Sequence, residues 1–127
     1  MESNTIEHEI RTKAKEWVGE FGADFLVELI GDYLDDAAAR LARMQQAVAA
    51  SDAKALMLEA HTLKSSSANL GALGLSAIAK RLEEMARAGN LAAVAGPVKQ
   101  FAEQFTLVKA SLEKLREAPD EYIAQER

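Results

Sequence analysis

The segment VAGPVKQFAEQFTLVKASLEKL, residues 94–115, carries the clearest structural signal in the chain. Its apolar residues recur at alternating spacings of four and three, which is typical of a helix that is buried along one side. These residues are Val94, Val98, Phe101, Phe105, Val108, Leu112 and Leu115. We therefore predict a long amphipathic helix whose regular part begins near Pro97, because proline is tolerated only in the first turns of a helix.

The same helical period runs through the rest of the chain, and no segment alternates like a half-buried strand. A second strongly amphipathic helix is predicted from about Asp24 to Ala50. A shorter helix before it ends around residues 19–22 and is expected to pack across the bundle, with Trp17 as a core anchor.

Capping residues mark the ends of two further helices. Ser51 and Asp52 supply the N-cap and a first-turn acid for a helix that stops at Gly71. The next helix ends at residues 89–90. Because the turn at residues 71–74 is short, we expect these two helices to run antiparallel.

Together the segments predict an all-α fold, an antiparallel up-and-down four-helix bundle with an additional short N-terminal helix. Residues 1–118 are expected to form a single helical domain with its core at about 20–117, because 127 residues is the size of one domain. Residues 119–127 are charged and lack an apolar seam, so we expect a frayed tail.

Composition excludes several classes of function. The net charge is -5 and the pI is about 5.1, so the chain lacks the basic surface that nucleic acid or an anionic membrane would require. The absence of cysteine excludes disulfides, thiolate catalysis and cysteine-based zinc sites. No signal peptide is recognisable, and no apolar run approaches the ~20 residues that span a bilayer. We expect a soluble, cytoplasmic protein.

The candidate functional residue is His61, in the third predicted helix. The seam of that helix consists of Leu56, Ala60, Leu63, Ser67 and Leu70. His61 follows a seam residue and is therefore rotated by about 100° onto the flank of the helix. Its neighbours on the helix surface are cationic, small or flexible: Met57, Lys64, Ser65 and Ala68. Since a neutral imidazole offers a lone pair at cytosolic pH, the pattern indicates a phosphoryl-accepting site.

Nearby residues have roles that suit such a site. Lys64, one turn after the histidine, places a positive charge that can offset the charge of a phosphoryl group. Glu83 lies on the flank of the next helix and could hold the second ring nitrogen, which would fix the tautomer of the imidazole. Ser65 leaves space for a partner surface, while Ser66 and Asn69 can hydrogen-bond locally.

Residues 61–71, HTLKSSSANLG, resemble the signature H-x-L-K-G-S-[SA]-x-x-[LVI]-G of the histidine-containing phosphotransfer (HPt) domains of bacterial phosphorelays. The resemblance covers most of residues 20–117. Ser65 stands where the family most often has glycine. Since serine adds only a hydroxyl group there, we expect docking of a partner to survive the difference.

The resemblance implies a carrier that takes a phosphoryl group from the aspartate of one receiver domain onto His61 and passes it to another. It also implies a hybrid sensor kinase upstream, no kinase or nucleotide-binding activity in this chain, and a monomer. The chain would bind no cofactor or metal, because Mg²⁺ would belong to the receiver domain. Partner docking would use exposed parts of Met57, Ala68 and Ala72 and the helix that begins near Asp24.

Two other classes of protein fit parts of the pattern. A non-catalytic helical module could dock a receiver domain on the same surface without chemistry. A four-helix bundle can also hold haem between a histidine and a methionine, and Met44, Met57 and Met85 are available. The position of His61 off the seam disfavours haem, because an axial ligand must point into the core.

Overall fold

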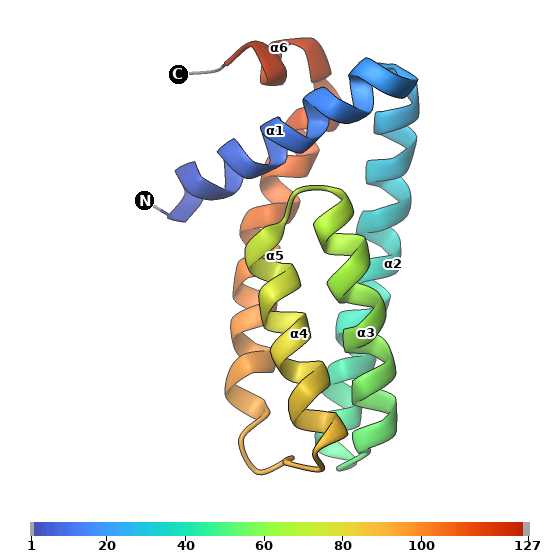
Figure 1. Cartoon of the computed structure of the whole chain (residues 1–127), viewed down its shortest axis with the longest axis vertical. Helices are drawn as coiled ribbons and strands as arrows, with labels where there is room; N and C mark the ends of the chain where they lie inside the picture. Colours follow the sequence, from blue (N-terminus) through green and yellow to red (C-terminus); the bar gives the residue numbers. More distant parts are fainter. Residues whose placement is uncertain (1, 126–127) are drawn as a thin grey trace.

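The computed structural model describes residues 2–125, and this part of the chain is helical with no strand. Its helices are α1 (Glu2–Phe21), α2 (Ala23–Ala49), α3 (Ala53–Asn69), α4 (Leu73–Arg87), α5 (Ala95–Glu117) and α6 (Pro119–Ala124). Helices α2 to α5 form an antiparallel up-and-down bundle, with α1 laid across one end (Figure 1). The predicted fold class is therefore confirmed.

The core forms where the predicted seams meet. All seven apolar residues of the repeat in residues 94–115 are buried, and the side chain of Phe101 is completely enclosed. The five seam residues of α3 are buried as well. The Tyr33 hydroxyl of α2 forms a buried hydrogen bond of 2.8 Å with the hydroxyl of Ser67, so the one polar member of the α3 seam is satisfied.

Helix α1 is longer than predicted. It has 20 residues, more than the 17 of α3, because a continuous stripe of Ile6, Ile10 and Ala14 packs on the end of the bundle and stabilises the whole helix. The expected end near residues 19–22 is confirmed: α1 stops at Phe21, and Gly22 follows with a φ of +90°.

Part of the predicted frayed tail is ordered, so that prediction was wrong for residues 119–124. Pro119 starts α6, whose first turn holds two acids that suit a helix N-terminus. Tyr122 is buried, and the guanidinium of Arg11 lies 4.9 Å from its ring centre and donates to its carbonyl oxygen at 2.8 Å. The Ser111 and Tyr122 hydroxyls also form a hydrogen bond. The end of the expected tail, residues 126–127, lies outside the described residues.

Trp17 is not the core anchor that the sequence predicted. It is only partly buried and packs against the core from outside. Its indole Nε1 donates to the carbonyl oxygen of Asn69 at 2.7 Å and thereby ties α1 to the end of α3. The centroid of its ring lies 5.7 Å from the ring centroids of Phe21 and Phe25, two residues that are 54% and 42% exposed.

The two turns that flank α3 position the helix carrying His61. At its start the Asp52 carboxylate accepts a hydrogen bond from the backbone nitrogen of Ala55, so Asp52 is the N-cap and Ser51 precedes it with a φ of +51°. At its end Gly71 has a φ of +81°, as expected for a glycine that terminates a helix. A Cβ atom at Gly71 would lie 2.5 Å from the carbonyl oxygen of Glu9, so α1 packs directly on this turn.

We expect Gly71→Ala to lower the free energy of unfolding by about 2–4 kcal/mol, because alanine adds both left-handed backbone strain and overlap with α1. Gly19→Ala is the matched control, since Gly19 is an exposed position of α1 where a Cβ atom would meet no other atom within 4 Å. It should raise stability by up to about 1 kcal/mol. Urea denaturation measures both. Equal stability of Gly71→Ala and the wild type would contradict the packing of α1 on this turn.

Candidate functional site

His61 lies in the middle of α3 on its outer side, where the sequence places it. Its side chain is 62% exposed, whereas the seam residues Ala60 and Leu63, which precede and follow it in sequence, are completely buried. The imidazole is therefore held on a rigid helix and remains open to solvent. Met44 is enclosed in the core, so the geometry does not bring these two residues together as axial ligands of a haem.

Glu83 of α4 is hydrogen-bonded to the imidazole. Its side chain is only 4% exposed, and its Oε2 lies 2.6 Å from Nδ1 of His61. Because an ionised carboxylate can only accept a hydrogen bond, Nδ1 must carry the ring proton. The lone pair is then on Nε2, the nitrogen on the other side of the exposed ring. The structure thus places Glu83 where the sequence analysis expected it.

Lys64 pairs with the same carboxylate. Its Nζ donates to Oε1 of Glu83 at 2.7 Å, and its side chain is 34% exposed. The sequence predicts a positive charge beside the histidine, but it does not predict that the carboxylate binds the ammonium group. The hydroxyl of Ser76 donates to the carbonyl oxygen of Lys64 at 2.7 Å, which holds α4 against α3 at this level.

Arg87 is a third partner of Glu83, and sequence reasoning missed it. Its Nη2 donates to Oε2 of Glu83 at 3.0 Å, one turn further along α4. The signal was present as an acid and a base four residues apart, a spacing that brings side chains together on a helix. Lys64 and Arg87 therefore both face the one carboxylate.

The surroundings of Glu83 lower its pKa from 4.5 to about 2. The hydrogen bond from Lys64 has the largest effect, and those from His61 and Arg87 lower the pKa further. Burial opposes this change, because a desolvated carboxylate is less stable in its charged form. Glu83 is therefore an anion at any physiological pH and a permanent acceptor for the His61 N–H group.

The surface around the imidazole consists of small and flexible side chains. Ser65 is exposed, and Met57 and Ala68 are half-buried, so these three residues can meet a partner. Ala72 is 3% exposed, and its predicted docking role is wrong. The reason is that Ala72 lies in the turn covered by α1, a tertiary contact that the helical period does not reveal.

Ser66 and Asn69 lie on the side of α3 that faces α2. The Ser66 hydroxyl is buried and has no hydrogen-bond partner within residues 2–125, and it lines a small cavity of about 200 Å³ between α2 and α3 with Leu29 and Tyr33. Asn69 is exposed, and its carbonyl oxygen binds the indole of Trp17. Their predicted local hydrogen bonding does not extend to the imidazole in the described structure.

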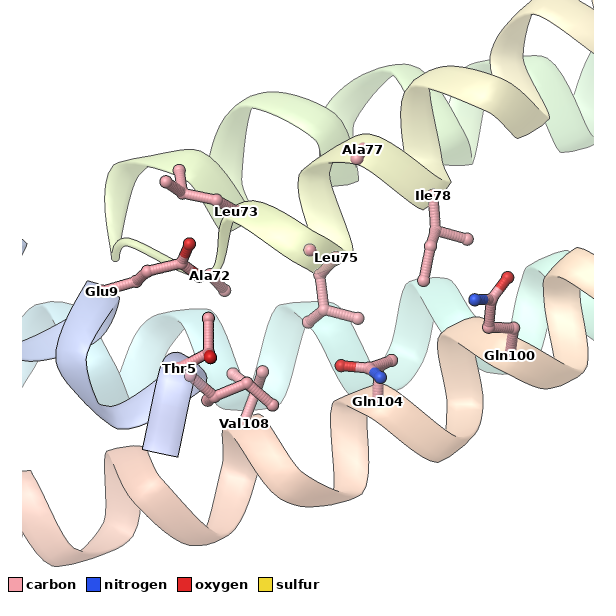
Figure 2. Close-up of a pocket in the computed structure, with 12 residues that line it drawn as sticks. Thr5, Glu9, Ala72, Leu73, Leu75, Ala77, Ile78, Gln100, Gln104 and Val108 are labelled. Atoms are coloured by element: carbon pink, nitrogen blue, oxygen red, sulfur yellow. The ribbon is translucent and has the colours of Figure 1, made fainter. Parts of the chain in front are cut away.

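A separate groove of about 440 Å³ lies between α1, α4 and α5. Figure 2 shows Leu75 and Ile78 along one of its sides and the amide groups of Gln100 and Gln104 along the other. None of its lining residues belongs to the cluster around Glu83. The candidate site is thus a surface feature of α3 and α4 and is not a pocket.

The described residues contain no group of three or more histidine, aspartate or glutamate side chains arranged to hold a metal ion. Within residues 2–125, none of the helices has the length and apolar character needed to cross a membrane.

Comparison with known proteins agrees with this geometry. The Hpt domain family matches residues 28–118, which is most of the chain. The fold is similar to the crystal structure of histidine-containing phosphotransfer protein B (HptB) from Pseudomonas aeruginosa PAO1, with a TM-score of 0.79 and 29% sequence identity over 84% of this chain and 91% of that chain. No curated protein sequence matches significantly.

The chain belongs to the Hpt domain family. Its function is that of a phosphotransfer intermediate in a two-component phosphorelay. The class of function expected from the sequence is therefore confirmed.

The pKa of Glu83 can be tested by NMR titration of its side-chain carboxyl carbon. We expect a midpoint at about pH 2, and Lys64→Gln should raise it because the largest stabilising hydrogen bond is removed. Since the folded-state pKa lies below the ordinary 4.5, the carboxylate stabilises the fold above about pH 4.5 and loses this contribution as the pH falls towards 2. A midpoint of 4.5 or higher would contradict the ion cluster.

Proposed function

We propose that His61 is the phosphoryl acceptor of this phosphorelay intermediate and that Nε2 is the nitrogen that carries the group. One observation supports this assignment above all: an exposed imidazole whose Nδ1 is held at 2.6 Å by a buried carboxylate. That arrangement directs the reactive lone pair outward and fixes the ring on a rigid helix, as a transfer between two docked proteins requires.

The transfer step requires only the imidazole and the phosphorylated receiver domain as reactants. The Nε2 lone pair attacks the phosphorus of an aspartyl phosphate on a receiver domain, a P–N bond forms, and the P–O bond to the aspartate breaks. The aspartate leaves as a carboxylate. The ring keeps its proton on Nδ1 and becomes positively charged, and the Glu83 carboxylate stabilises that charge. The reverse sequence passes the group to a second receiver domain.

Lys64 is proposed to stabilise the charge of the phosphoryl group, since its ammonium group lies one helical turn from His61 on the same helix. The donor and acceptor are receiver domains of response regulators, supplied by a hybrid sensor kinase, and Mg²⁺ is bound by the receiver and by no residue of this chain. We further propose that the protein acts in the cytoplasm as a monomer.

The proposed docking surface extends along α3 on both sides of His61. On the side towards α4 lie Met57 and Ala68, and on the side towards α2 lies Leu58, which is 52% exposed. Phe25, at the start of α2, extends this apolar surface past the end of α3 through its contact with Trp17. An apolar surface around a reactive group favours a partner that excludes water during transfer.

We expect the chain to acquire an acid-labile, base-stable phosphate when it is incubated with a receiver domain that carries radiolabelled phosphate from acetyl phosphate and Mg²⁺. Receiver domains encoded in the same genome serve as the probes. His61→Gln should abolish the label, because glutamine keeps polarity and size but has no nucleophilic ring nitrogen. His8→Gln is the matched control and should be labelled like the wild type, since His8 is the other histidine and is exposed on α1.

Equal labelling of wild type and His61→Gln would overturn the assignment. Binding of a receiver domain with no label on any histidine of the wild type would favour the non-catalytic docking module.

We expect Ser65→Arg to slow transfer from the receiver domain by about tenfold or more, because a large side chain would occupy the space that the partner needs. The matched control is Ala110→Arg, an exposed position on α5, which lies diagonally across the bundle from α3. Direct labelling by phosphoramidate, a small donor, should be the same in both variants. Unchanged transfer from the receiver in Ser65→Arg would contradict the proposed docking surface.

A further inference from the structure

The two oxygens of Glu83 are not used equally. Within residues 2–125, Oε1 accepts from Lys64 alone, at 2.7 Å, whereas Oε2 accepts from both His61 and Arg87, at 2.6 Å and 3.0 Å. Glu83 is buried, so neither oxygen has ready access to water. One oxygen thus depends on a single cation, and the other has a cation in addition to the ring N–H group.

Two roles compete for the ammonium group of Lys64: pairing with the Glu83 carboxylate and stabilising a phosphoryl group on His61. If its ammonium group turns to a phosphoryl group on His61, it leaves Oε1 of a buried carboxylate without a partner. An unpaired buried charge is strongly destabilising, so the departure would be costly unless another cation replaced the ammonium group. Strong pairing with Glu83 would otherwise hold Lys64 away from the group it is needed for.

We propose that Arg87 is a positioning residue that takes over the Glu83 carboxylate when Lys64 turns to the phosphoryl group, an inference that rests on the proposed function of His61. A guanidinium group has five N–H donors in a planar fork and can bind both oxygens of a carboxylate at once. The Arg87 side chain is 61% exposed, so it has the freedom to move from one oxygen to both.

The position of Arg87 on α4 supports this role. It follows Glu83 by four residues on the same helix, so the two side chains stay together when the lysine turns to the phosphoryl group. It also lies in the last turn of α4, where the free carbonyl groups of the helix favour a cation. Arg87 therefore acts on the reaction through Glu83 and Lys64, without contact with the phosphoryl group.

The test measures transfer to His61 from the phosphorylated receiver domain that labels the wild type, over a range of receiver concentrations. Arg87→Gln should lower the maximal rate about tenfold, which corresponds to about 1.4 kcal/mol of barrier, and leave the half-saturating receiver concentration unchanged. Arg87→Lys should recover most of the rate, because it restores a cation beside Glu83. Arg81→Gln is the matched control, since Arg81 is an exposed arginine on α4 about 120° around the helix from Arg87.

A double-variant cycle separates this role from direct contact with the phosphoryl group. In a Lys64→Gln chain there is no lysine to release, so Arg87→Gln should cause little further loss of rate. The same loss in both backgrounds would overturn the proposal, as would a change confined to the half-saturating concentration or a wild-type rate in Arg87→Gln. Thermal unfolding of each variant identifies any loss of fold. If Arg87→Gln fails to fold, the rate of Arg87→Lys, which keeps the charge, tests the proposal in its place. Absence of label on the wild-type chain would instead overturn the proposed function.

Discussion

The buried carboxylate of Glu83 is the group on which the arrangement of the site depends. It joins α3 to α4 through His61 and Lys64 and binds Arg87 on its own helix. A charge in this position is tolerated only because cations surround it, and the same cations lower its pKa to about 2. One ionised side chain thereby sets the tautomer of the imidazole and the position of the lysine.

The bundle around this carboxylate is what the helical period in the sequence predicts. The repeat in residues 94–115 became a fully buried seam, and the rotation of His61 by one residue from the α3 seam correctly predicted an exposed ring. The contacts that α1 and α6 make at the end of the bundle do not correspond to a helical period in the sequence. Helix α6 buries Tyr122 within only six residues, and Trp17 of α1 is only partly buried against the core. Such features depend on where α1 comes to lie, which no local pattern encodes.

The residues of the site also divide into those that the sequence predicts and those that it does not. The residue types in residues 61–71 and the flank position of Glu83 were enough to predict that His61 and Glu83 meet, because two antiparallel helices with short connections have few possible registers. The partner of Lys64 was not predictable, since the spacing shows only that a lysine and a carboxylate are near. Arg87 was missed because an acid and a base four residues apart are common on helix surfaces and rarely matter. Ala72 was misplaced because α1 covers it.

The exposure of the imidazole bears on the lifetime of a phosphoryl group on this protein. At 62% exposure the ring is not enclosed by residues 2–125, and a phosphoryl group on Nε2 would be largely surrounded by water. The lifetime of the charged carrier between encounters is then a property of the P–N bond and its neighbouring ions rather than of an enclosing cavity. Signal duration in such a pathway would be governed by how soon the next partner arrives.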